Sequence, residues 1–113
     1  MRDVIIPVMN LSVVIPVYNE EHNIREILRR VQATKLAKEI VVVDDGSQDG
    51  TREILKKMDG KGKVRVILHE RNKGKGAAVV TGLNAAKGDV LLIQDADLEY
   101  DPRDYPALLQ PIH

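Results

Sequence analysis

The sequence contains no cysteine, tryptophan or phenylalanine, and these absences exclude several kinds of site. Without cysteine there is no disulfide framework and no thiolate metal site. Three tyrosines are the only aromatic residues, so aromatic platforms for stacking single-stranded nucleic acid are not expected. Seventeen basic and seventeen acidic residues cancel, so the net charge favours neither nucleic acid nor an anionic membrane surface as a partner.

A long hydrophobic run is also missing. The apolar stretch at 4–17 is broken by proline and polar residues and is too short for a membrane span. Within it, VIIPVMN (4–10) resembles VVIPVYN (13–19), and only the second copy leads into a helical pattern. We therefore expect residues 1–10 to be an N-terminal extension and residues 11–113 to form one domain. No signal-peptide pattern is present, which favours a cytoplasmic location.

Short apolar runs alternate with helical patterns along the chain. The runs are rich in Val, Ile and Leu without polar alternation, which is typical of strands buried on both faces of a parallel sheet. They cover residues 11–17, 39–44, 63–69 and 89–95. The order is β-α-β-α-β-α-β, with a further short helix expected over 103–109, and it predicts a doubly wound α/β sheet with helices on both faces. The third helical pattern places one set of apolar residues on one side: Ala77, Val80, Leu83 and Ala86.

Polar residues follow the apolar run at the end of every predicted strand. Ligands of open α/β sheets bind at the carboxyl ends of the strands, so a site is expected there. The motifs at these ends are PVYNEE (16–21), VVDDGSQDG (42–50), HERNKGKG (69–76) and QDADLEYD (94–101). A buried core needs none of these polar residues, so their convergence is the main physical indication of a ligand site.

The last motif has the composition of a metal site. Asp95 and Asp97 are two residues apart, and Glu99 would follow on the same side of an extended chain. Hard oxygen ligands in this number suit Mg²⁺ or Mn²⁺, with phosphate oxygens completing the shell. Such a cation would neutralise a diphosphate and help it to leave. The alternative is a solvated acidic turn, while Asp101 is interpreted as a cap of the following helix.

The motif after the second strand has a structural and a binding interpretation. The segment 45–49 is expected to form a turn and a helix cap. Asp44 is then the freer carboxylate and could accept hydrogen bonds from a nucleobase or a ribose. After the first strand, Tyr18 could stack on a base, and Asn19 or Glu20 is expected to open the next helix.

The glycine-rich motif before the third helix is weaker. Gly74 and Gly76 could let the backbone approach a phosphate, with Lys75 or Lys73 pairing with it. The alternative is a flexible turn with solvated lysines, which we favour for Lys73. The histidines have no metal-ligand spacing and are interpreted as surface residues: His22, His69 and His113.

In their order and spacing, these motifs resemble family 2 glycosyltransferases of the GT-A fold. The resemblance rests on VVIPVYNEEHNI, EIVVVDDGSQDGT, NKGKGAAVVTGL and GDVLLIQDADLEYDP and spans residues 11–109. The DADLEYDP form is most similar to the dolichyl- or polyprenyl-phosphate mannose and glucose synthase branch. The resemblance implies a Rossmann-like parallel sheet and transfer of a sugar from a GDP- or UDP-sugar to an acceptor such as a polyprenyl phosphate.

The resemblance also implies roles for individual residues. Asp95 and Asp97 would hold Mg²⁺ or Mn²⁺ and the diphosphate, with Glu99 as a further metal ligand. The nucleotide contacts that it implies are Pro16, Tyr18, Glu20, Val42, Asp44, Lys75 and Ala96.

The family's catalytic domain is about twice as long as this chain. We therefore expect a truncated domain that contains the donor-binding half and lacks the acceptor site and catalytic base, with membrane association in a full-length form. An exposed sheet edge would invite homo-oligomers. Two alternatives are a nucleotide-binding module without catalysis and a receiver-like signalling domain, since paired aspartates after a strand also occur in phospho-acceptor pockets. The acids after the fourth strand argue against the second alternative.

Overall fold

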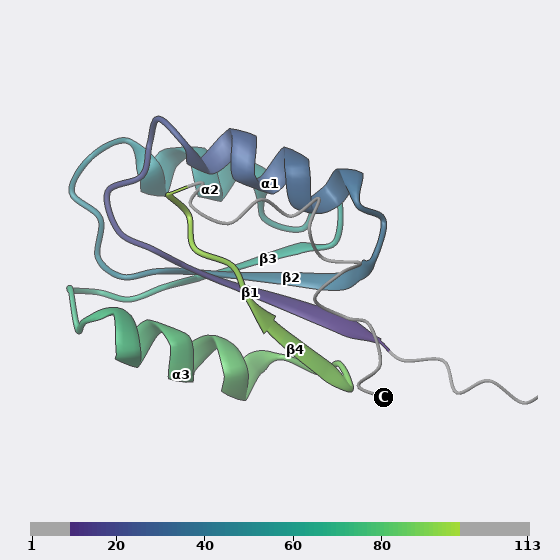
Figure 1. Cartoon of the computed structure of the whole chain (residues 1–113). Helices are drawn as coiled ribbons and strands as arrows, with labels where there is room; N and C mark the ends of the chain where they lie inside the picture. The colour runs from purple at the N-terminus through teal and green to yellow at the C-terminus, as the bar shows by residue number, and fades with distance from the viewer. Residues whose placement is uncertain (1–9, 98–113) are drawn as a thin grey trace, which may run out of the picture.

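A computed structural model of the chain describes residues 10–97, which form a parallel sheet of four strands with helices on both faces (Figure 1). The predicted α/β, Rossmann-like fold class is confirmed. Residues 1–9, Glu99, Asp101 and the helix expected at 103–109 lie outside the described residues. The elements are β1 (Leu11–Val17), α1 (Ile24–Ala33), β2 (Ala37–Asp44), α2 (Thr51–Met58), β3 (Val64–Leu68), α3 (Lys75–Ala85) and β4 (Val90–Ile93).

The strand order β3-β2-β1-β4 places the chain's first strand near the middle of the sheet. The chain builds outward from β1 to β3 and then returns to add β4 on the other side of β1. The direction of winding therefore reverses between β1 and β4. In open parallel sheets, the crevice at the carboxyl ends of such a strand pair is where ligands bind.

The core has one apolar layer on each side of the sheet. Helices α1 and α2 cover one face and α3 covers the other (Figure 1). On α1, Ile24, Ile27, Leu28 and Val31 are fully buried, as their helical spacing predicts. Replacing one of these residues by Ala would lower the free energy of unfolding by about 2–5 kcal/mol. Within residues 10–97, no helix is long and apolar enough to cross a membrane.

Helix α3 lies unusually close to the sheet because its contact face is made of small residues. Ala78 and Gly82 are buried there, and a Cβ on Gly82 would lie 2.3 Å from Val14 Cγ1. By contrast, Val80 is 56% exposed. The apolar side expected from the sequence, which includes Val80, is therefore only partly the side that faces the sheet. The apolar residues of α3 are spread around the helix, so its sequence alone does not fix which side faces the sheet.

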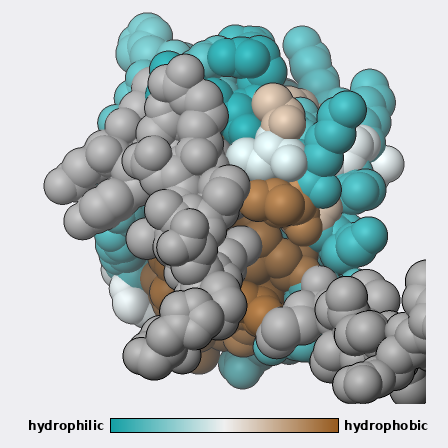
Figure 2. Space-filling view, turned by 45° about the vertical axis from the view of Figure 1, so that its right-hand side comes forward, coloured by the Kyte–Doolittle hydropathy of each residue, from teal (hydrophilic) through white to brown (hydrophobic). Residues whose placement is uncertain are grey.

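Among the strands of residues 10–97, β4 lies at the edge of the sheet, and it is exposed on one face, contrary to the expectation of burial on both. Val90 and Leu92 pack against the layer under α1, whereas Leu91 and Ile93 are 45% and 46% exposed. Their register with β1 puts them on the side of α3, which packs over β1 and β2. Figure 2 brings the right-hand side of Figure 1 forward and shows hydrophobic surface there.

Candidate active site

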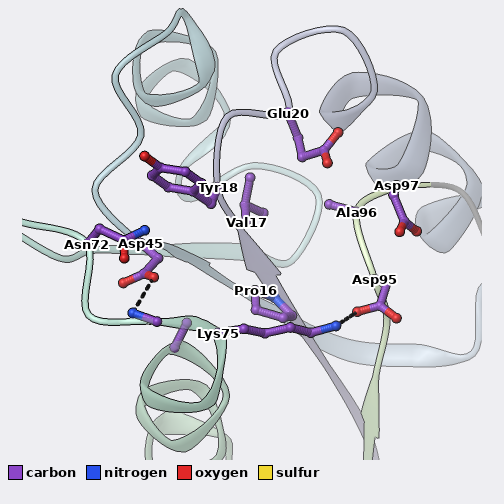
Figure 3. Close-up of a pocket in the computed structure, with 12 residues that line it drawn as sticks. Pro16, Val17, Tyr18, Glu20, Asp45, Asn72, Lys75, Asp95, Ala96 and Asp97 are labelled. Carbon is purple, nitrogen blue, oxygen red and sulfur yellow. Dashed lines mark hydrogen bonds and ion pairs between the residues drawn. The ribbon is translucent and has the colours of Figure 1, made fainter.

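A pocket of about 430 Å³ lies at the carboxyl edge of the sheet, where loops that follow the four strands meet (Figure 3). The loops after β1 and β4 both line it, so it occupies the point where the winding reverses. The predicted site residues that line it are Pro16, Tyr18, Glu20, Lys75, Asp95, Ala96 and Asp97. The fold thus brings together residues that are far apart in the sequence.

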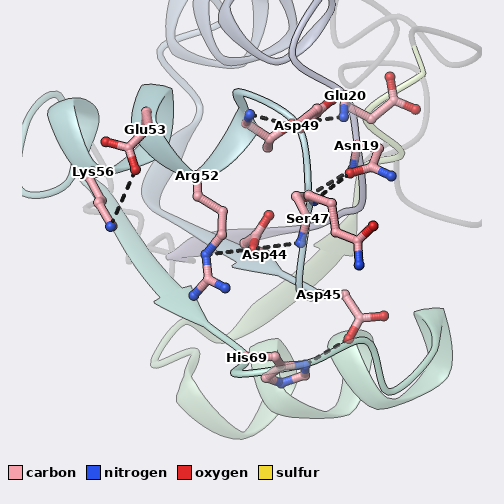
Figure 4. Close-up of polar contacts among 12 residues, drawn as sticks. Asn19, Glu20, Asp44, Asp45, Ser47, Asp49, Arg52, Glu53, Lys56 and His69 are labelled. Atoms are coloured by element: carbon pink, nitrogen blue, oxygen red, sulfur yellow. Dashed lines mark hydrogen bonds and ion pairs between the residues drawn. The ribbon is translucent and has the colours of Figure 1, made fainter.

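The loop after β1 is fastened to the loop between β2 and α2 (Figure 4). Asn19 N donates to Ser47 Oγ at 2.9 Å, and Glu20 N donates to Thr51 Oγ1 at 2.9 Å. Tyr18 is held beside the pocket with its side chain 44% exposed, available for contact with a ligand. The sequence predicts a helix start at Asn19 or Glu20. Asn19 has a left-handed backbone (φ 52°), which does not continue into a helix, while Glu20 O accepts from Ile24 N at 2.9 Å, where α1 begins.

Asp44, the last residue of β2, is buried and does not line the pocket. Asp44 has no exposed surface; its Oδ2 accepts from Ser47 N at 3.1 Å and lies 3.4 Å from Arg52 Nε. Among residues 10–97, its Oδ1 has no hydrogen-bond partner. Val42 is likewise fully buried, in the core. Neither residue is among those that line the pocket, and Asp44 also makes the turn contact that the sequence assigns to its neighbour. The roles of Val42 and Asp44 as nucleotide contacts stay predictions.

The second aspartate, Asp45, lines the pocket instead. Its carboxylate accepts from the backbone N–H of Lys73 and Gly74 at 2.9 Å each and contacts the ring of His69. Burial acts to raise the pKa of this carboxyl, but the hydrogen bonds from His69, Lys73 and Gly74 outweigh it and hold the pKa below its usual value. Asp45 is therefore an ionised acceptor at neutral pH.

The prediction that His69 is a surface residue is wrong, because it is only 7% exposed. Its Nδ1 lies 2.9 Å from Asp45 Oδ1, and its Nε2 lies 2.9 Å from Thr81 Oγ1 on α3. In the sequence, the signal for this burial was its position: it directly follows the apolar run of β3. The prediction weighed histidine only as a metal ligand and not as a hydrogen-bonding core residue.

The glycine-rich loop between β3 and α3 forms another wall of the pocket. Asn72, Gly74 and Lys75 line it, and α3 begins at Lys75, so the helix N-terminus faces the pocket. Gly46 allows the β2 loop to pass this wall, because its φ is 76° and a Cβ there would lie 2.4 Å from Asn72 N. A helix N-terminus beside a lysine favours an anionic group.

The acidic pair after β4 closes the pocket on the remaining side. Asp95 and Asp97 line it with Ala96 between them, and Ala96 is anchored in the core at 5% exposure. Asp95 forms an ion pair with Lys75 (Figure 3). Within the described part of the chain, no group of three or more His, Cys, Asp or Glu side chains could hold a metal ion. A cation at this pair would therefore take further ligands from a bound molecule or water.

Two curated relatives are similar to almost the whole chain. An undecaprenyl-phosphate 4-deoxy-4-formamido-L-arabinose transferase of Pseudomonas aeruginosa (strain LESB58) is 45% identical over 111 residues, covering 92% of this chain and 32% of that protein. A dolichol-phosphate mannosyltransferase of Pyrococcus furiosus is 42% identical, covering 92% of this chain and 30% of that protein. The chain thus spans about a third of the length of these relatives.

Solved structures show the same similarity. A mannosyltransferase of Pyrobaculum calidifontis in complex with GDP-Man and Mn²⁺ has a TM-score of 0.77 and 29% identity, over 91% of this chain and 33% of that one. TarS of S. aureus (1–349) in complex with UDP-GlcNAc has a TM-score of 0.75 and 33% identity, over 88% of this chain and 30% of that one. The sequence model described as glycosyl transferase family 2 matches residues 12–113. The resemblance seen in the motifs is therefore confirmed, and the chain belongs to glycosyl transferase family 2.

Proposed function

We propose that this chain forms the donor-binding part of a glycosyltransferase that takes a sugar from a nucleoside diphosphate sugar. One observation carries the proposal. One wall of the pocket has an aromatic ring and hydrogen-bonding side chains suited to a nucleoside, the opposite wall is acidic, and a lysine lies between them. Tyr18, Asp45 and Asn72 lie on one side and Asp95 and Asp97 on the other, and Lys75 reaches across (Figure 3). A nucleoside diphosphate needs these three kinds of contact in this order.

The nucleoside would bind beside β1 and β2. The exposed ring of Tyr18 offers a stacking surface. Asp45 is the acceptor for an N–H of the base or a hydroxyl of the ribose, because Asp45 and not Asp44 lines the pocket. Pro16 and Glu20 complete this wall. Val42 and Asp44, the other nucleotide contacts expected from the resemblance, lie on β2 next to Asp45 and stay predictions.

The diphosphate would lie between the N-terminus of α3 and the acidic pair. Lys75 and the helix N-terminus provide positive charge for it. The donor set of Asp95 and Asp97 fits Mg²⁺ or Mn²⁺, since two carboxylates face one pocket and a cationic group already contacts one of them. When bound, such a cation supplies charge neutralisation for the diphosphate leaving group. Ala96 holds the two carboxylates at the pocket by its burial, and Glu99 is proposed as a further ligand.

The acceptor is proposed to be a polyprenyl phosphate. The relatives with 45% and 42% identity carry the names of an undecaprenyl-phosphate transferase and a dolichol-phosphate transferase, which supports this class. In the reaction, an acceptor phosphate oxygen bonds to the anomeric carbon of the sugar as the nucleoside diphosphate leaves. Family membership excludes the receiver-like alternative.

The test is calorimetry of the 113-residue chain with UDP and GDP, with and without Mn²⁺, followed by a sugar-transfer assay with polyprenyl phosphate. We expect binding of one nucleotide that is tighter with Mn²⁺. Binding without transfer would support the module alternative, in which the chain holds the donor only. Absence of binding by both nucleotides in the presence of Mn²⁺ would refute the proposed site.

A further inference from the structure

We propose that His69 is a positioning residue. It holds the Asp45 carboxylate in the orientation in which that carboxylate faces the nucleoside and accepts hydrogen bonds from the backbone of the glycine-rich loop. The inference rests on the proposed nucleotide site and assigns part of its specificity to a residue outside the pocket lining. His69 itself does not line the pocket. It acts through Asp45, which does.

The ring of His69 is buried with both nitrogens bonded. Its backbone N–H donates to Asp44 O at 2.8 Å, which continues the pairing of β3 with β2 past the end of the strand. Its Nδ1 lies 2.9 Å from Asp45 Oδ1 (Figure 4). Its Nε2 lies 2.9 Å from Thr81 Oγ1. A buried imidazole without partners would be unfavourable, so this arrangement fixes the ring orientation.

The direction of the bond to Asp45 follows from the chemistry of the two groups. An ionised carboxylate can only accept, so Nδ1 of His69 must carry the proton in this contact. Thr81 Oγ1, which can donate or accept, satisfies the other nitrogen. The contact thus links the end of β3, the end of β2 and the middle of α3.

The carboxylate of Asp45 also accepts two backbone hydrogen bonds, one on the oxygen that contacts His69 and one on the other oxygen. Oδ1 accepts from Lys73 N, and Oδ2 accepts from Gly74 N. Gly74 is the residue immediately before the first residue of α3. If the His69 donor is lost, two backbone donors from one loop remain, and the carboxylate can turn with that loop. His69 provides the fixed point on the sheet that prevents this.

Two substitutions separate positioning from general stability. In His69→Asn, the amide nitrogen can take the place of Nδ1 and keep the bond to Asp45. In His69→Leu, the bulk of the side chain is largely kept and the donor is lost. His22→Leu is the matched control, because the side chain of His22 is 92% exposed.

The first readout is amide hydrogen exchange at Lys73 and Gly74, measured by NMR in the absence of any nucleotide. We expect His69→Leu to lose protection at these two amides while β1 and β2 stay protected, and His69→Asn to retain it. The second readout is the Kd for UDP and GDP with Mn²⁺. We expect His69→Leu to weaken binding on the order of tenfold, as loss of a hydrogen bond to a charged group can do, with recovery in His69→Asn.

The proposal is overturned if His69→Leu keeps wild-type protection at Lys73 and Gly74, or if its losses are uniform across the sheet. It is equally overturned if His69→Asn binds nucleotide no better than His69→Leu at equal thermal stability. If the wild-type chain binds neither nucleotide, the proposed function fails, and the exchange measurement still decides whether His69 positions Asp45.

Discussion

The ammonium of Lys75, in the first turn of α3, contacts the carboxylate of Asp95, which follows β4 on the opposite side of the pocket (Figure 3). A basic group of the chain therefore occupies the position beside Asp95 where a divalent cation is proposed to bind. The two cations compete for one carboxylate. Lys75 would contact the diphosphate only after it has left Asp95.

Lys75→Gln is expected to raise the affinity for Mn²⁺ in nucleotide-free protein, because the competing ammonium is removed. The Lys75 side chain is 65% exposed and that of Asp95 24% exposed, so water screens the pair and the gain should be about two- to fivefold. The same variant should bind UDP or GDP more weakly, since the diphosphate loses a positive contact. Electron paramagnetic resonance of free Mn²⁺ measures the first effect. Lys73→Gln, on the same loop but outside the pocket lining, is the control; equal Mn²⁺ affinities in both variants would contradict the competition.

Asp97→Ala is expected to abolish the Mn²⁺ dependence of nucleotide binding. Asp97 is exposed, so its removal should leave the thermal unfolding midpoint unchanged to within about 2 °C. Calorimetry with and without Mn²⁺ measures the effect. Glu70→Ala, another exposed acid outside the pocket lining, should retain the dependence. A persistent Mn²⁺ effect in Asp97→Ala would refute its assignment as a metal ligand.

Substitutions of the two adjacent aspartates at the end of β2, Asp44 and Asp45, should affect different properties. Asp44→Asn should destabilise the fold by about 1–3 kcal/mol, because the buried contact with Arg52 loses its charge. Asp45→Asn should weaken nucleotide binding instead, since its amide would oppose one of the two backbone donors of the glycine-rich loop. Urea denaturation and nucleotide titration of both variants distinguish the roles. The assignment would be reversed if Asp44→Asn bound nucleotide poorly at unchanged stability.

The pH dependence of stability should have a component from Asp49. Burial acts to raise the pKa of its carboxyl, but hydrogen bonds from Thr51 and from Glu21 N outweigh it and lower the pKa. A lowered folded-state pKa stabilises the protein above the unfolded-state pKa of about 3.9. This contribution is lost as pH falls through the folded-state value. Wild-type protein and Asp49→Asn should therefore differ in unfolding free energy at pH 7, and the difference should shrink as the pH falls below the unfolded-state pKa of about 3.9, as urea titrations would show.

Two glycines of α3 provide a matched test of its close packing. Gly82→Ala should destabilise the protein by about 1–3 kcal/mol, because the new methyl group would overlap Val14. Gly76→Ala, where a Cβ meets no atom within 4 Å, should instead stabilise it by about 0.5–1 kcal/mol through helix propensity. Thermal unfolding measures both changes. Equal effects of the two substitutions would show that α3 does not rest on Val14.

The sequence predicted the order of strands and helices because apolar runs and helical spacing are local signals. It also predicted that the residues after β1 and β4 meet, since strand ends gather at one edge. It could not predict which of Asp44 and Asp45 faces the pocket, because that depends on one step of side-chain alternation at the strand end. Nor could it place His69, whose partners Asp45 and Thr81 come from other elements. The exposure of β4 depended on which strands α3 covers, and no local pattern records that.

The short, one-sided pairing of β4 has a consequence for how the pocket assembles. β4 contacts β1 across nearly eighty positions of the chain, with Leu11 opposite Val90, whereas β1, β2 and β3 are joined by nearer neighbours. Contacts of such large sequence separation carry a higher loop-closure cost than contacts between neighbouring elements. The carboxylates of Asp95 and Asp97 should therefore belong to a separate, weaker cooperative unit than Tyr18 and Asp45. A ligand that contacts both units would bind with an affinity that depends on how often β4 is docked, and it would in turn hold the sheet closed.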